Sequence, residues 1–93
     1  MTAPGERELH IAGVLVQARP AAVSRLRQDI PALPGATLAQ WAEDGRLVAV
    51  LEHDSADGVM QSLSALRDLP GVLNVALVYQ HAEPWAVMQQ PMT

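Results

Sequence analysis

The stretch "IAGVLVQA", residues 11–18, carries no polar side chain before Gln17. A strand with one face on a core and the other in water alternates apolar and polar residues. Here both alternating positions are apolar, and the β-branched residues Val14 and Val16 favour a strand. The sequence therefore predicts a strand over residues 9–18 whose second face needs a cover.

The segment after this strand predicts a helix, a second strand and a hairpin. Pro20 suits the first turn of a helix, apolar residues recur every three or four positions as far as Leu33, and Pro31 predicts that the helix ends near Asp29 or Ile30. The run "LPGATLAQWAEDGRLVAVLEH" then predicts turn, strand, turn and strand. Asp44-Gly45 is the hairpin turn, and residues 46–53 form the later strand.

The last third of the domain predicts a second helix and a final strand. Asp54 or Ser55 is suited to cap the helix. Its apolar stripe contains Val59, Leu63 and Leu66, and Pro70-Gly71 ends it. "VLNVALVYQ", residues 72–80, is the final strand.

The resulting order is β-α-β-β-α-β, and the sequence repeats weakly, because "ALPGATLAQW" follows the first helix and "DLPGVLNVAL" the second. Two strand–helix–strand units with right-handed crossovers predict an α+β, ferredoxin-like fold. Its four-stranded antiparallel sheet has the order 4-1-3-2, with both helices on one face. We expect an N-terminal arm over residues 1–8, the domain over 9–81, and a flexible or folded-back tail over 82–93.

Polar residues at the strand ends assign the two faces of the sheet, because side chains alternate with period two. A β-bulge would invert part of this assignment. The face predicted to lie away from the helices consists of Gly13, Leu15, Gln17, Arg46, Val48, Val50, Glu52, Asn74, Ala76, Val78 and Gln80. The core is predicted to contain Ala12, Val14, Val16, Leu47, Ala49, Leu51, Val75, Leu77 and Tyr79.

The uncovered face is thus apolar in the middle and polar at its two rims, and Gly13 leaves room for a ligand to sit deep. An apolar patch of a few hundred Å² on a small domain marks an interaction site. A peptide partner is the favoured occupant. The alternatives are a homodimer that pairs two sheets face to face and the C-terminal tail folding over the sheet.

Composition excludes several classes of function. The chain has 93 residues, no cysteine and a net charge of −4, with ten acidic against six basic residues. The missing cysteines exclude disulfides and thiol chemistry, and the acidic balance argues against nucleic-acid binding. No secretory signal or membrane-spanning run is visible, so we expect a cytoplasmic protein without membrane insertion.

No catalytic, metal or cofactor site is predicted. His10, His53 and His81 all lie near one end of the expected sheet, but no closely spaced pair of ligands supports zinc. Nucleophile-elbow, triad and phosphate-loop patterns are absent.

Several stretches resemble the NapD family: "GVLVQARP", "LPG", "GRLVAVLE" and "LRDLPGVLNVALVY", spread over residues 9–81. The resemblance implies a cytoplasmic, non-enzymatic chaperone for the catalytic subunit of periplasmic nitrate reductase. Members of the family bind the twin-arginine signal peptide of that subunit as a helix on the sheet face. This binding is thought to delay export until the molybdenum cofactor of the reductase is inserted.

Transferred to this sequence, the resemblance implies a monomer or weak homodimer with a peptide site on the uncovered face. Glu52 is the expected carboxylate for the arginines of the peptide, with Asp54 and Asp57 just beyond the strand. The predicted peptide-binding residues are Gly13, Leu15, Gln17, Val48, Val50, Glu52, Asn74, Ala76 and Val78.

Two other functions share the β-α-β-β-α-β order. A small-molecule regulatory domain of the ACT type binds amino acids and is usually attached to an enzyme. An acylphosphatase-like enzyme needs a glycine-rich, arginine-bearing phosphate loop after the first strand, and "QARPAAV" lacks that form.

Overall fold

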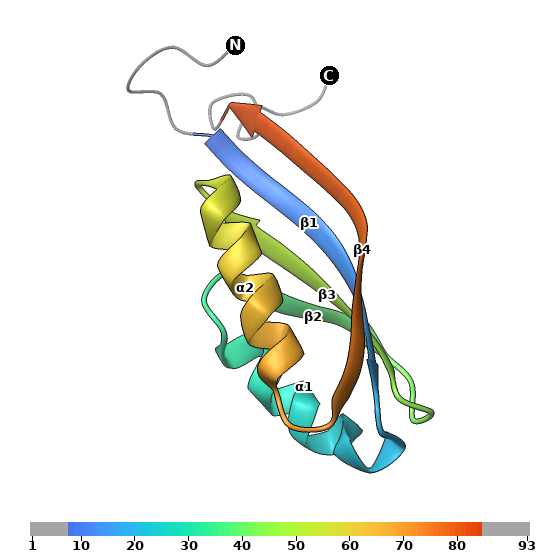
Figure 1. The fold of residues 1–93 in the computed structure, drawn as a ribbon. Coiled ribbons are helices and arrows are strands. Elements are labelled where there is room, and N and C mark those ends of the chain that lie inside the picture. Colours follow the sequence, from blue (N-terminus) through green and yellow to red (C-terminus); the bar gives the residue numbers. More distant parts are fainter. Residues whose placement is uncertain (1–7, 85–93) are drawn as a thin grey trace.

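The computed structural model describes residues 8–84. Four strands and two α-helices follow one another in the predicted order (Figure 1). Their bounds are β1 Glu8–Ala18, a 3₁₀ turn Pro20–Ala22, α1 Val23–Ala32, β2 Ala36–Trp41, β3 Arg46–His53, α2 Ala56–Asp68 and β4 Val72–Pro84.

The strands form one antiparallel sheet in the order β2-β3-β1-β4, which is the predicted order 4-1-3-2 read from the other edge. Both helices lie on the same side of this sheet (Figure 1). The ferredoxin-like α+β fold is therefore confirmed. Within residues 8–84, no helix covers the second face of the sheet.

The weak sequence repeat encodes the same turn twice. After α1, Ala36 N donates to Leu33 O across Pro34-Gly35, and after α2, Val72 N donates to Leu69 O across Pro70-Gly71. Gly35 and Gly71 have φ angles of +75° and +90°. Proline followed by a left-handed glycine is the signature of a type II turn, and it returns each helix to the sheet.

The first helix runs further than its proline predicted. We expected an end near Asp29 or Ile30, but α1 continues through Pro31 to Ala32. Proline in the last turn removes only one hydrogen bond, and the chain turns extended at Leu33. At the second helix, Ser55 is the N-cap, because its hydroxyl accepts a hydrogen bond from Gly58 N at 3.0 Å.

The core lies between the helices and one face of the sheet. All predicted core residues of β1 and β3 are buried, and Val75 of β4 is buried with them. The helices contribute Leu26, Ile30, Val59, Leu63 and Leu66. The alternation assigned from sequence therefore holds for the two central strands.

The prediction for β4 is wrong from Leu77 onward. Leu77, predicted in the core, points to the helix side but is 46% exposed. Gly13 of β1 pairs with Tyr79, but Val14 pairs with Leu77, so Val78 is the extra residue of a β-bulge. Every later side chain therefore points to the opposite face. Tyr79, predicted in the core, lies on the uncovered face, and Gln80, opposite Ala12, lies on the helix side.

The last strand is also longer than predicted, because it continues past Gln80 to Pro84, which pairs with Glu8. Residues 82–84, which we assigned to the tail, belong to the sheet. The rest of the predicted tail and residues 1–7 of the predicted arm lie outside the described residues.

A small polar contact joins β3, α2 and the turn before β2. The Ser62 hydroxyl donates to Pro34 O at 3.2 Å and lies 2.7 Å from His53 Nε2. Since its single hydrogen is used on Pro34, it accepts from a protonated Nε2. Ser62 is buried, so this contact fixes the loop that leads into β2.

The Ser62→Ala variant should lower the free energy of unfolding by about 1–3 kcal/mol, because the buried Pro34 carbonyl and the His53 ring lose their partner. Chemical denaturation measures the change. Ser64→Ala, on the exposed side of the same helix, is the control and should change stability by less than about 0.5 kcal/mol. Equal effects of the two variants would contradict a structural role for this contact.

Candidate functional site on the open face of the sheet

The side of the sheet that faces away from both helices, called the open face here, is the candidate site. Ala12, Val14 and Val16 point into the core, so the alternate residues of β1 and their partners on β3 and β4 point outward. The open face consists of Ile11, Gly13, Leu15, Gln17, Thr37, Gln40, Arg46, Val48, Val50, Glu52, Asn74, Ala76, Tyr79 and His81.

Eight of the nine residues predicted for the site lie together on this face. Leu15 pairs with Val48 and Ala76, and Gly13 pairs with Val50, so these residues are direct cross-strand neighbours. Gln17, Arg46 and Asn74 form one rim, as predicted. The exception is Val78, which occupies the bulge and has no partner on β1.

The space expected above Gly13 is occupied. A Cβ atom built on Gly13 would come within 2.1 Å of Tyr79 Cε1 and within 3 Å of two further ring atoms. The Tyr79 ring therefore lies against the backbone of Gly13 and leaves half of its own surface exposed. Gly13 admits the protein's own aromatic side chain to the centre of the face, where we had expected a ligand.

Sequence reasoning missed Ile11 and Tyr79. Ile11 follows from the same alternation that placed Gly13 and Leu15, because it lies two residues earlier on β1. Tyr79 could not be found by alternation, since the bulge at Val78 inverts the pattern before it. The available signal was a lone glycine in an apolar strand, which often marks a bulge or a close approach.

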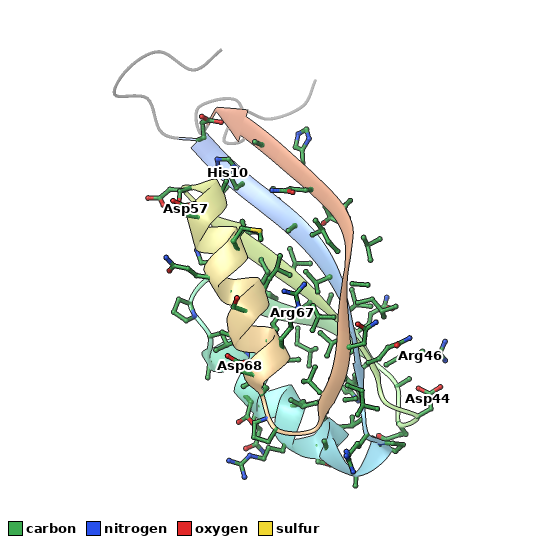
Figure 2. The ribbon with its side chains drawn as sticks, viewed as in Figure 1. His10, Asp44, Arg46, Asp57, Arg67 and Asp68 are labelled. Atoms are coloured by element: carbon green, nitrogen blue, oxygen red, sulfur yellow. The ribbon has the colours of Figure 1, made fainter. Side chains whose placement is uncertain are left out.

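One end of the open face has a hollow beside a neutralised arginine. The hollow has a volume of about 240 Å³ and is lined by Leu15, Gln40, Trp41, Ala42, Arg46 and Val48. Asp44, in the hairpin turn, lies 3.0 Å from the Arg46 guanidinium (Figure 2). Hydrogen bonds from that guanidinium lower the pKa of the Asp44 carboxyl. The ion pair therefore balances the charge of Arg46 at this end.

The other end carries an unpaired carboxylate. Glu52 is exposed and pairs across the sheet with Ile11, and within residues 8–84 it makes no ion pair. Asp57 was expected near the arginines of the peptide. It lies instead in the first turn of α2, on the helix side of the sheet (Figure 2), and does not reach the open face. Glu52 is therefore the carboxylate best placed to receive a cation there.

The dimensions of the face match one helix. Gln17 lies six residue steps after Ile11 on β1, which corresponds to roughly 20 Å. About 13 helical residues cover that length. The three strands β3, β1 and β4 span about 10 Å, which is close to the diameter of a helix with its side chains.

The three histidines do not converge on one site. His10 pairs with His53, whereas His81 pairs with Ile11 on the open face. In the described part of the chain, no group of three potential ligand side chains could hold a metal ion. None of the helices in that part is both long and apolar enough to cross a membrane.

The curated relatives that this chain resembles are named as chaperones. Chaperone NapD of Escherichia coli K12 is 31% identical over 74 residues, which cover 78% of this chain and 85% of the relative. Chaperone NapD of Haemophilus influenzae is 26% identical over 78 residues, covering 83% and 84%.

The chain also resembles solved structures. The solution structure of the E. coli Tat proofreading chaperone protein NapD matches with a TM-score of 0.73 at 27% identity, over 91% of this chain and 90% of that chain. A transcriptional regulatory protein of the AsnC family from Pyrococcus furiosus shares the fold alone, at 15% identity and a TM-score of 0.58. The sequence model described as NapD protein matches residues 9–84, and the chain belongs to the NapD family.

Proposed function

We propose that this protein is a cytoplasmic, non-enzymatic chaperone. Its ligand would be the twin-arginine signal peptide of the catalytic subunit of periplasmic nitrate reductase, bound as a helix on the open face. Binding would hold back export until the subunit has received its cofactor. The observation that carries the proposal is an apolar sheet face that no helix of residues 8–84 covers. The face has the size of one short helix, and the carboxylate at one end makes no ion pair within those residues.

The order of charged and apolar residues in such a peptide fits the open face in one orientation. Its arginines would lie at Glu52, and the apolar stretch after them would run across Leu15, Val48 and Val50. A large apolar side chain could enter the hollow beside Arg46 at the far end. Because Asp44 pairs with Arg46, the Arg46 charge there does not repel a positively charged peptide.

The free energies of burial and association indicate that both the apolar stretch and the arginines of the peptide contribute to binding. Covering roughly 400 Å² of apolar surface gains about 10 kcal/mol before costs. Association costs about 4–15 kcal/mol. The apolar contact alone therefore gives weak binding, and the charged contact at Glu52 adds a modest amount of affinity and sets the direction. Family membership favours this function over the ACT-type alternative.

Titration of the isotope-labelled protein with a synthetic twin-arginine signal peptide tests the proposal directly. We expect amide shift changes along β1, β3 and β4 at residues of the open face. Changes confined to α1 and α2, or an absence of binding at millimolar peptide, would overturn it.

Val50→Asp should weaken peptide binding at least tenfold, because it places a carboxylate under the apolar part of the peptide. Calorimetric titration measures the affinity, and thermal unfolding shows that the variant is folded. Ala76→Asp makes the same change at an exposed position of the face, and Ser64→Asp on α2 is the control. Normal affinity in both folded face variants would contradict the placement.

Glu52→Gln should weaken binding by about two- to fivefold and reduce its dependence on salt, because an exposed ion pair is modest in energy and screened by ions. The measurement is the dissociation constant over a range of ionic strengths. Glu43→Gln, in the turn after β2, is the charge-matched control. Loss of affinity with an unchanged salt dependence would move the arginine contact away from Glu52.

Tyr79→Ala should weaken binding about tenfold or more, since it removes a half-exposed aromatic ring from the centre of the face. Leu77→Ala is a matched control, because Leu77 is 46% exposed on the same strand but points to the helix side. Fluorescence anisotropy of a labelled peptide measures both. A larger effect of Leu77→Ala would show that the peptide binds on the helix side.

A further inference from the structure

Exposed apolar side chains gather on one flank of the domain, along β4 and α2. Six large hydrophobic side chains are exposed in residues 8–84, and β4 carries four of them: Leu73, Leu77, Val78 and Tyr79. A fifth, Met60, belongs to α2. A helix on the open face would contact Tyr79, so the other four need a separate explanation.

Met60 lies on the side of α2 that faces β4. Arg67, two helical turns later, points to that side (Figure 2) and lines a hollow of about 190 Å³ together with residues 72–75. Residues seven positions apart share a face of a helix, so Met60 belongs to the same stripe as Arg67. Met60 therefore joins Leu73, Leu77 and Val78 in one surface, which we call the β4 flank.

Two β-bulges divide β4 on this flank. The adjacent β1 residues 17 and 18 pair with β4 residues 74 and 72, so Leu73 is the extra residue of one bulge, as Val78 is of the other. Between the bulges, residues 74–77 pair regularly with β1, and within residues 8–84 no strand lies on their other side. A further strand beside β4 therefore finds a regular run of four residues.

The free edge of β4 carries no charge that would prevent strand pairing. It has no lysine, arginine, aspartate or glutamate between Val72 and Ala82. Edge strands commonly carry such charges, because an apolar edge pairs with other chains. At the opposite edge of the sheet, the Arg27 guanidinium lies 4.1 Å from the centre of the exposed Trp41 ring, so a charge is present there. β4 is therefore the edge suited to association.

We propose that the β4 flank binds a second copy of the chain across a two-fold axis, with the two β4 strands antiparallel and edge to edge. The same surface then serves both copies, as two-fold symmetry requires. An axis near Ala76 places Val75 of one copy opposite Leu77 of the other, and both side chains lie on the helix side. It also brings Leu73 of one copy beside Val78 of the other, so exposed apolar side chains cover each other.

The charges near the flank suit a second copy. The paired edges bring no like charges together, although the chain has a net charge of −4. Arg67 lies in the last turn of α2 and Asp57 in the first, at opposite ends of the helix (Figure 2). The two-fold axis reverses one α2 relative to the other, so the end with Arg67 in one copy lies nearest the end with Asp57 in the other. Opposite charges therefore approach each other at both ends of the contact.

The area of the flank predicts weak association. Leu73 and Val78 lie five residue steps apart, or roughly 17 Å, and a sheet with one helix layer is about 20 Å thick. The contact covers about 350 Å² per copy and about 700 Å² in total, whereas a stable complex buries about 1,200 Å² or more. We therefore expect a dissociation constant of roughly 0.1–1 mM. The inference does not depend on the proposed function, because edge pairing leaves the open face accessible.

Amide spectra of the isotope-labelled, full-length protein between about 0.05 and about 2 mM test the dimer. Shifts on β4 and on the β4 side of α2 should change with concentration, and translational diffusion should slow as the mass rises above 10.0 kDa. Leu73→Lys and Val78→Lys should each raise the dissociation constant at least tenfold, because each places a cation in the apolar contact. Thr37→Lys, the same charge on the edge strand β2, is the control and should change it less than about twofold.

Three results would overturn the proposal. Spectra and diffusion that stay constant up to about 2 mM would show that the chain does not pair with itself. Association that Leu73→Lys and Val78→Lys leave unchanged would place the contact away from the β4 flank. Loss of association in Val50→Asp, with no effect of the two edge variants, would assign the contact to two open faces packed together.

Discussion

The structure depends on β1, which must pair with two neighbours at once. Its buried side chains point to the helices, so its other side chains must point away from them. Two helices on one side of a four-stranded sheet cannot cover the second side. An apolar central strand therefore produces both the core and an apolar surface that no helix of residues 8–84 covers.

The two ends of the open face differ in charge. Arg46 is held by Asp44 in the hairpin turn, whereas Glu52 has no such partner within residues 8–84. The apolar centre favours a helix of limited length, and the difference between the ends favours one orientation of it. Fold and proposed function are thus linked by the antiparallel pairing of β1 with β3, which puts Glu52 and Arg46 at opposite rims.

The β-bulge at Val78 separates two surfaces on one strand. Before it, Ala76 faces the proposed peptide site and Leu77 faces the helices; after it, the order of faces is inverted. Tyr79 thereby enters the open face and rests on Gly13. The same inversion leaves exposed apolar side chains on both faces of β4, with Leu77 toward the helices and Tyr79 on the open face.

Alternating apolar residues and the repeated Leu-Pro-Gly turns determined the fold class, the strand order and most of the open face. These signals are local: period two assigns Leu15 and Val50, and proline followed by glycine ends each helix. The position of Tyr79 was decided only by the tertiary structure. The bulge at Val78 brings the Tyr79 ring over Gly13, and that contact joins residues 66 positions apart, beyond the reach of any local pattern.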